Sequence, residues 1–198
     1  MRSSALLMCM ETGRRGALSR CAGWRPISPG QPRQRSTSIS TTERSSCTDS
    51  RAGPTHFKLV SAVHVFLLRD NRVLLLRRAG TGYQDGKYSV VAGHLDGGEE
   101  VCAAAVREAR EEVGIDLDAD QLEVVGIMHR LSDDERIDFF LAASSWSGEI
   151  RNKEPSKCDR LAWYEIGGLP EEVIPYVRRA LDNYRRGVWF DSFGWEAG

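Results

Sequence analysis

The sequence has few of the features that mark several common protein classes. Only five of its 198 residues are cysteine, three of them lie in the first 55 residues, and no two have the spacing of zinc ligands. This odd and scattered set excludes a disulfide framework and indicates a reducing compartment. No apolar run approaches the length of a transmembrane helix, so we expect no membrane partner.

An excess of one charge is also missing, since the formal net charge is −1. The charges are nevertheless segregated. Residues 1–55 carry nine Arg, no Lys and three acidic residues, which gives +6, and the rest of the chain carries −7. A net acidic body argues against a stable nucleic-acid partner for the domain itself, and the sequence leaves the oligomeric state open.

Residues 1–55 are rich in Ser, Arg, Thr, Gly and Pro and show no sustained apolar period. This composition predicts a disordered extension, followed by a folded domain over residues 56–198. A transit peptide, a basic arm that attracts RNA and a dispensable stretch upstream of the true start codon remain open, although three prolines would break a long amphipathic helix. We expect a cytoplasmic protein, or a mitochondrial one if the extension is a transit peptide.

Carboxylates are concentrated near the middle of the chain, within residues 93–115, GHLDGGEEVCAAAVREAREEVGI. Glu108, Glu111 and Glu112 are spaced i, i+3 and i+4, so a helix would project all three from one face. Their mutual repulsion can be relieved by the arginines of the same helix or by a divalent cation. Clustered hard oxygen ligands suit Mg²⁺ or Mn²⁺.

The turn before this helix and the opposite helical face support a packed, metal-binding helix. Several glycines permit a tight turn, and Asp96 followed by Glu99 predicts that Asp96 caps the helix. The opposite face carries an apolar stripe that predicts packing on a sheet. The stripe consists of Val101, Ala105, Ala109 and Val113.

The stretch resembles the signature of the Nudix hydrolases: Gly, five residues, Glu, seven residues, Arg-Glu, an apolar residue, one residue, Glu-Glu, one residue, Gly and an apolar residue. The matching positions are Gly93, Glu99, Arg107, Glu108, Glu111, Glu112, Gly114 and Ile115. Ala109 is a mild departure, since the family usually has a larger aliphatic residue there. The resemblance implies an α/β/α sandwich with a mixed sheet and hydrolysis of a nucleoside diphosphate linked to another moiety.

The resemblance also implies a metal site. Glu108 and Glu112 would be direct Mg²⁺ ligands, and Glu111 would be a ligand directly or through water. The backbone carbonyl of Ala92, just before the signature, would add another ligand.

Other roles follow from the same resemblance. Arg107 would orient the glutamates by pairing with Glu99. In MutT-type enzymes a loop like WSGEIRNKE carries an extra metal-binding Glu, which here is Glu154. As an alternative, Glu154 is a solvated loop charge. The general base stays open between Glu111 and Glu154.

Outside the signature, Arg78 closes a strand and could reach substrate phosphates, as in MutT-like enzymes. Asp138 lies in an apolar strand and faces either the substrate pocket or water. His64 is more often a packed or surface residue than a ligand at such a position. The aromatic residues of the tail are expected in the core rather than in a base-stacking platform. These are Trp189, Phe190, Phe193 and Trp195.

Alternating and β-branched patterns predict strands over residues 58–68, 73–76, 87–92, 122–129, 136–144 and 161–166. A helix is expected over 171–186, introduced by Pro170, with Val173, Val177, Ala180 and Leu181 facing the core. Strands on both sides of a central helix and a terminal helix indicate the α/β class.

Similarity to MutT-type enzymes favours a nucleoside triphosphate that is cleaved to a monophosphate and pyrophosphate. Residues 130–132 contain neither the Pro of ADP-ribose hydrolases nor the Tyr of dinucleoside polyphosphate hydrolases. ADP-ribose, dinucleotides and RNA 5′ ends remain alternative substrates, and a non-catalytic nucleotide sensor remains an alternative function. An isomerase of isoprenoid diphosphates would need a reactive cysteine, for which Cys102 and Cys158 are poor candidates.

Overall fold

The computed structural model describes residues 57–195. The predicted extension over residues 1–55 therefore lies outside the described residues. In chain order the elements are β1 (Val60–Arg69), β2 (Arg72–Arg78), β3 (Tyr88–Ser89), β4 (Val91–His94), α1 (Val101–Val113), the 3₁₀ turn η1 (Ala119–Gln121), β5 (Glu123–Leu131), β6 (Glu135–Ala143), β7 (Cys158–Glu165), α2 (Pro175–Arg186) and β8 (Phe190–Phe193).

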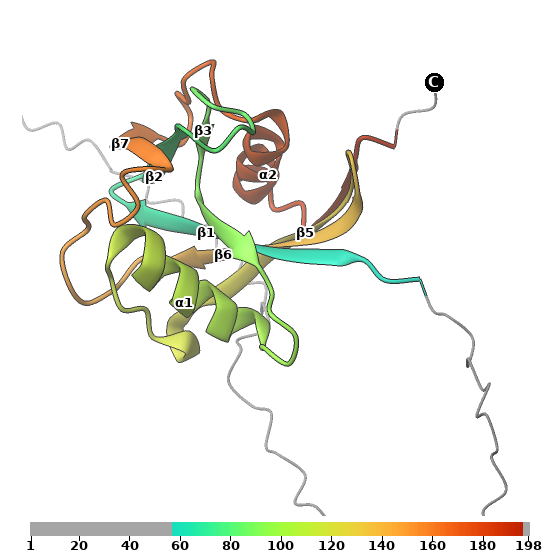
Figure 1. Ribbon diagram of the computed structural model, residues 1–198, viewed down its shortest axis with the longest axis horizontal. Coiled ribbons are helices and arrows are strands. Elements are labelled where there is room, and N and C mark those ends of the chain that lie inside the picture. Colours follow the sequence, from blue (N-terminus) through green and yellow to red (C-terminus); the bar gives the residue numbers. More distant parts are fainter. Residues whose placement is uncertain (1–56, 196–198) are drawn as a thin grey trace, which may run out of the picture.

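The strands form one mixed sheet in the order β3-β2-β1-β6-β5-β8, with β4 paired to β1 and β7 paired to β2. The pairs β1–β6 and β5–β8 are parallel, and the other pairs are antiparallel. Helices α1 and α2 pack on opposite sides of this sheet (Figure 1). The expected α/β/α sandwich with a mixed sheet is confirmed.

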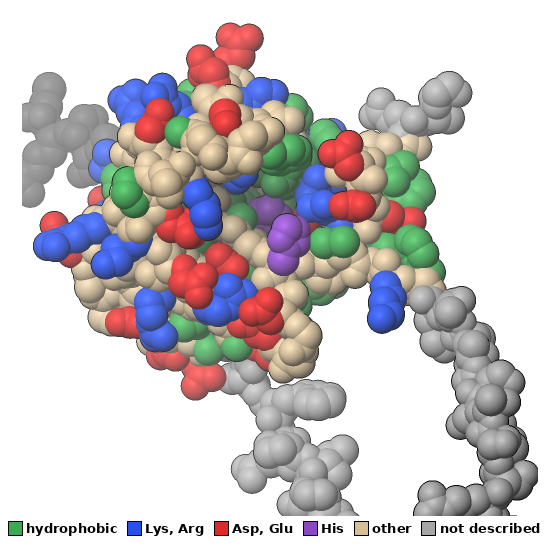
Figure 2. Space-filling model, viewed as in Figure 1, with side chains coloured by type: hydrophobic (Ala, Val, Ile, Leu, Met, Phe, Trp, Pro, Cys, Tyr) green, Lys and Arg blue, Asp and Glu red, His purple; other side chains and the backbone are tan. Residues whose placement is uncertain are grey.

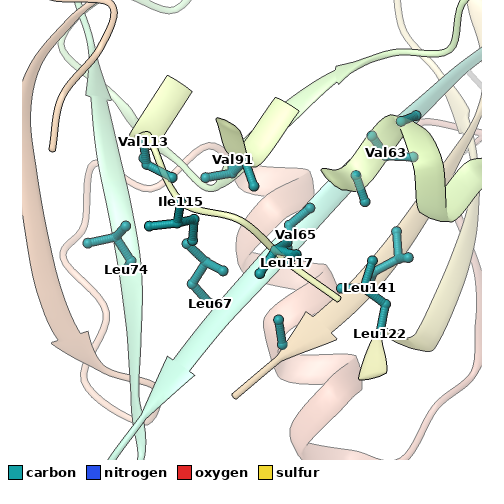
Figure 3. Close-up of a cluster of buried hydrophobic side chains, with 14 of the residues drawn as sticks. Val63, Val65, Leu67, Leu74, Val91, Val113, Ile115, Leu117, Leu122 and Leu141 are labelled. Atoms are coloured by element: carbon teal, nitrogen blue, oxygen red, sulfur yellow. The ribbon is translucent and has the colours of Figure 1, made fainter. Parts of the chain in front are cut away.

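Strand β1 divides the core because its side chains alternate between the two faces. Val63, Val65 and Leu67 are fully buried in the cluster that contains α1, and Phe66 is fully buried in the cluster that contains α2. Figure 3 shows the first cluster, in which Val113 and Ile115 at the end of α1 lie near Leu67 and Leu74. The predicted apolar stripe of α1 packs here, which turns the carboxylate face of the helix away from the core.

The start of α1 differs from the expectation. Glu100, not Asp96, is the N-cap, and its carboxylate accepts the N–H groups of Cys102 and Ala103 at 2.8 and 3.2 Å. Asp96 lies in the preceding turn, where its carbonyl accepts the N–H of Glu99. The turn that Asp96 begins therefore ends at Glu99, directly before the N-cap. Glu100 caps the helix at a position where a shorter side chain is more usual.

Helix α2 begins at Pro175, four residues later than predicted. The N–H of Ile174 donates to the carbonyl of Tyr88, and the carbonyl of Glu172 accepts the N–H of Tyr88, so this segment bonds to β3 rather than to a helical turn. Pro175, not Pro170, occupies the first helical turn. The predicted core-facing residues Val173, Val177, Ala180 and Leu181 are all buried.

The tail forms an eighth strand that the sequence did not predict. Phe193 packs against the α2 cluster, whereas Trp189, Phe190 and Trp195 are exposed at 50, 55 and 42%. The expected burial of the tail aromatics is therefore wrong for three of four residues. Neither of the described helices is long and apolar enough to cross a membrane.

Candidate active site

The carboxylate of Glu108 lies directly against strand β4. Glu108 is only 9% exposed, and a Cβ atom built on Gly93 would stand 1.8 Å from its Oε1 atom. Any side chain at position 93 would therefore displace this carboxylate. The glycine is needed here for the close approach of helix and strand, not for its backbone freedom.

Arg107 forms ion pairs with the neighbouring acidic side chains. Its Nε and Nη2 donate to Glu99 at 2.8 and 2.9 Å, and its Nη1 donates to Glu108 at 2.6 Å. A longer contact of 3.4 Å reaches Glu111. The guanidinium holds the pKa of Glu99 down to about 2. The predicted pair of Arg107 and Glu99 is thus present, and Arg107 relieves part of the carboxylate repulsion; Arg110 instead pairs with Asp116.

Glu112 has a different environment. Its Oε2 accepts the backbone N–H of Ala92 at 3.1 Å. Burial raises the pKa of this carboxyl to about 8, and burial also raises the pKa of Glu108. Two adjacent acids that resist ionisation in a sheltered place form a site that favours an added cation.

The loop that carries Glu154 is fixed beside Glu112. The backbone N–H of Lys153 donates to the carbonyl of Glu112 at 3.0 Å, and the negative charge of Glu154 helps to raise the pKa of Glu112. Glu112 and Glu154 line one small cavity of about 50 Å³, together with Arg78 and Cys158. The structure therefore brings Glu154 to the carboxylate helix, as the loop resemblance suggests.

The carboxylates of Glu108, Glu111 and Glu154 do not point toward one common position. Arg107 holds Glu108 and Glu111, and Lys157 holds Glu154 at 2.7 Å. Within residues 57–195, no three His, Cys, Asp or Glu side chains stand as a ready cluster for a metal ion. The sheltered carboxylates, the close approach of Gly93 and the hard oxygen donors nonetheless have the chemistry that suits Mg²⁺ or Mn²⁺.

A larger cleft of about 290 Å³ opens on the other side of the β4 backbone. Its wall includes Ala92 and Gly93, so the strand that supports Glu108 and Glu112 also borders the cleft. Figure 2 shows acidic and basic side chains mixed over α1, next to a hollow with histidine side chains on its wall. The size and position of the cleft suit a small ligand that reaches the carboxylates.

Arg78 borders both the cleft and the smaller cavity. Its Nε donates to the carbonyl of Tyr83 at 2.9 Å, and its Nη2 donates to the hydroxyl of Thr81 at 3.1 Å. No carboxylate within the described chain forms an ion pair with Arg78. The loop residues Thr81 and Tyr83 therefore fix the guanidinium of Arg78 through neutral acceptors, and its positive charge has no ion-pair partner among the described residues.

Asp138 lies behind the cleft wall instead of facing the ligand or water. It is fully buried, and its Oδ2 accepts the Nε of Arg130 at 2.5 Å. Burial alone would raise its pKa, but His64 and Arg130 hold the pKa down to about 2. Arg130 lines the cleft and stacks 4.0 Å above the ring of Tyr176.

His64 completes this wall. It is 3% exposed, stacks on Phe140 and stands 3.4 Å from Asp138. Its Nδ1 has no hydrogen-bond partner in the described chain. The sequence did not point to Arg130, Tyr176 or His64 as cleft residues. Opposite charges at inward-facing positions of two strands joined by a hairpin were the signal that could have found the Arg130–Asp138 pair.

Comparison with known proteins gives consistent matches. The family model of the NUDIX domain matches residues 58–184. A MutT NUDIX hydrolase from Burkholderia pseudomallei is 26% identical with a TM-score of 0.59, and the match covers 64% of this chain and 98% of that chain. A NUDIX hydrolase from Nitrosomonas europaea, 24% identical with a TM-score of 0.57, shares the fold over 67% of this chain and 93% of that chain.

Two curated proteins are also similar. An NAD-capped RNA hydrolase NudC from Stutzerimonas stutzeri is 36% identical over 147 residues, which is 67% of this chain but 45% of that protein. An isopentenyl-diphosphate Delta-isomerase from Cereibacter sphaeroides is 30% identical over 142 residues, which is 65% of this chain and 80% of that protein. The chain therefore spans less than half the length of the NudC relative.

Proposed function

The chain belongs to the NUDIX domain family, and from this premise we propose that it is a pyrophosphohydrolase dependent on a divalent cation, Mg²⁺ or Mn²⁺. The proposal includes the assignment of residues 56–198 as the catalytic domain. The observation that carries it is the sheltered pair Glu108 and Glu112, whose pKa values are raised by burial beside a cleft lined by arginines.

The proposed metal ligands are Glu108 and Glu112, with Glu111 joining directly or through water and the carbonyl of Ala92 completing the set. When bound, the cation would screen phosphate charge and acidify the attacking water. Arg107 would position Glu108 from its anchor on Glu99.

Two further residues act on the substrate or on the water in this proposal. Arg78 exchanges its bonds to the loop for phosphate oxygens, which guanidinium groups bind well. Glu154, once released from Lys157, takes a proton from the attacking water, and Glu111 is the alternative base. Asp138 supports ligand binding indirectly because it fixes Arg130 in the cleft wall.

The preferred substrate is a nucleoside triphosphate, cleaved to a monophosphate and pyrophosphate. The similarity to the MutT hydrolase supports this choice. The NudC similarity favours a second candidate, a dinucleotide or an RNA 5′ end that carries one. Activity on ADP-ribose belongs to the same group of alternatives, and binding without turnover would indicate a sensor.

The similarity to an isomerase makes Cys158 relevant, because it lines the cavity of Glu112. Burial raises the pKa of the Cys158 thiol, which disfavours the thiolate, and the thiol donates to the carbonyl of Arg160. Cys102 is buried in the core cluster of α1. Neither cysteine has the environment of a reactive nucleophile, so hydrolysis is the preferred chemistry.

The test is a panel of nucleotides, ADP-ribose, dinucleotides and isopentenyl diphosphate in Mg²⁺. Phosphate release is measured with and without inorganic pyrophosphatase for the triphosphates, and after phosphatase treatment for ADP-ribose and the dinucleotides. Isomerisation is followed by product analysis. Phosphate from triphosphates only in the presence of pyrophosphatase is the expected result. Activity confined to another substrate class would replace the nucleotide assignment by that class.

The variant Glu112→Gln tests the metal assignment. We expect it to keep the fold and to lose about a thousandfold in kcat/KM, equivalent to ~4 kcal/mol, because the amide is a poor ligand for Mg²⁺. Glu171→Gln, at an exposed position before α2, is the matched control and should retain activity. Near-normal turnover by Glu112→Gln would remove Glu112 from the proposed site.

A further inference from the structure

Helix α1 covers only part of one face of the sheet, and the β5–β8 end of that face is exposed. On β5, Met128 and Arg130 point toward α2 and are buried, whereas Ile127 and His129 point to the opposite face and are only half-buried. Helix α1 packs on β1 and β4, and it leaves the β5–β8 end of this face uncovered (Figure 1). Strand β8 pairs with β5, and its other edge has no strand partner within the described chain.

Exposed apolar side chains are concentrated at this end. Seven large apolar side chains are exposed among residues 57–195, and six of them lie on β5, on or next to β8, or next to the start of β1. The six are Phe57, Leu59, Leu131, Trp189, Phe190 and Trp195. Trp189 borders a cavity with Ala180 and Asn183 of α2 and so belongs to the other side of the sheet. We call the other five residues, with the half-buried Ile127 between them, the β8 face. Exposed apolar side chains grouped in this way mark a contact surface.

The tail is built to hold these aromatics in place. Gly194 has φ +80°, and a Cβ atom on it would lie 2.0 Å from the carbonyl oxygen of Leu131. This contact requires glycine and pins the tail to the end of β5. The indole of Trp195 then donates to the carbonyl of His129 at 3.1 Å and lies 4.5 Å from its ring. Trp195 is thus fixed and yet remains 42% exposed.

Two acidic side chains beside the β8 face have basic partners within the chain. His129 pairs with Glu135 at 2.9 Å, and Asp191 pairs with Arg179 at 2.7 Å. A surface of this kind does not repel an identical surface. The exposed aromatics Phe57, Phe190 and Trp195 contribute about 100 Å² each, since an aromatic side chain can bury roughly 150–250 Å². With the leucines and Ile127, the total approaches the ~450 Å² of apolar area that each partner contributes to a standard interface.

We propose that the β8 face packs against the same face of a second copy of this chain across a two-fold axis. A contact between two identical surfaces related by a two-fold axis closes at a dimer. Residues 1–55 are the competing occupant, and the experiment below distinguishes the two because only a second copy makes the contact depend on protein concentration. None of the six side chains lines the cleft, so the proposal is independent of the proposed function.

The test is sedimentation velocity of the full chain from 1 to 200 µM in the presence of Mg²⁺, chosen to cover ordinary dimer affinities. We expect the wild-type chain to be a dimer. The variant Phe190→Asp should weaken the dimer at least about thirtyfold, as expected for loss of a central aromatic contact. Its circular dichroism and hydrolytic activity should match the wild type.

The control variant is Tyr83→Asp, which places the same charge on an exposed aromatic residue away from the β8 face. It should remain a dimer. A wild-type chain that stays monomeric throughout the concentration range overturns the proposal, whether residues 1–55 or nothing covers the face. A Phe190→Asp dimer of unchanged affinity also overturns it, because the contact would then lie elsewhere.

Discussion

Two carboxyl groups of this domain, one half-buried and one fully buried, have opposite electrostatic environments. Burial raises the pKa of Glu112 on α1 to about 8. Asp138 on β6 is more deeply buried, yet His64 and Arg130 hold its pKa down to about 2. The difference comes from the partner, because Asp138 has a fixed guanidinium at 2.5 Å and Glu112 has a single backbone N–H. A buried acid with its own cation stabilises structure, whereas one without a cation is suited to take a metal.

Arg107 does not remove this contrast although it is only five positions from Glu112. Its guanidinium is occupied by Glu99, Glu108 and the carbonyl of His94. Glu112 therefore remains without a cationic partner at hydrogen-bond distance. Arg107 thus pairs with the acidic side chains near the start of the helix, and Glu112, one turn further on, is left to bind an added cation.

The largest effect is expected from removing the structural acid. Asp138→Asn leaves Arg130 buried without a counter-charge, and we expect a loss of about 3–5 kcal/mol of unfolding free energy. Urea unfolding of the metal-free protein measures it. Asp133→Asn, at the exposed rim of the cleft, is the control and should change stability little. If Asp138→Asn instead raised KM without loss of stability, Asp138 would contact substrate directly.

A smaller effect is expected from pH. The folded-state pKa of Glu112, about 8, lies above its ordinary value of 4.5, so the folded protein binds a proton that the unfolded chain releases between these pH values. Stability of the metal-free protein should therefore fall as pH rises from 4.5 to 8. We expect a loss of about 2 kcal/mol, below the linkage limit of roughly 5 kcal/mol, because Glu112 is only half-buried.

The same measurement on Glu112→Gln should remove the larger part of this slope, since the amide does not titrate, and Glu108, whose pKa is also raised by burial, accounts for the remainder. Glu99 and Asp138 have depressed pKa values of about 2, so their stabilisation is complete above pH 4.5 and does not enter the window. If stability fell with pH as steeply in Glu112→Gln as in the wild type, another group would bind the proton. Glu112 would then not differ from Asp138 in the way described.

The contrast also explains what the sequence could predict. The ligand candidates on α1 are local, because Glu108, Glu111 and Glu112 share a helical face whatever the rest of the chain does. The Arg130–Asp138 pair depends on the register of β5 against β6, where Met128 stands opposite Asp138. The predicted strand over residues 122–129 ended one residue before Arg130, and the register was not fixed, so sequence reasoning named Asp138 and missed its partner.

Local hydrogen bonds explain the other differences. Asp96 had the right residue type for an N-cap, but the chain turns once more before α1 and Glu100 takes that place. Helix α2 starts late because its expected first turn bonds to Tyr88 instead. Strand β8 was unpredictable from its own four residues, since it exists through its parallel pairing with β5.

The most direct measurement is calorimetric titration of Mg²⁺ into the metal-free protein at pH 7, in two buffers of different ionisation enthalpy. At this pH the carboxyl of Glu112 is mostly protonated, so binding should release close to one proton, and Glu112→Gln should bind weakly and release none. Equal affinity and equal proton release in Glu112→Gln and the wild type would contradict the claim that Glu112 loses its proton and becomes a metal ligand.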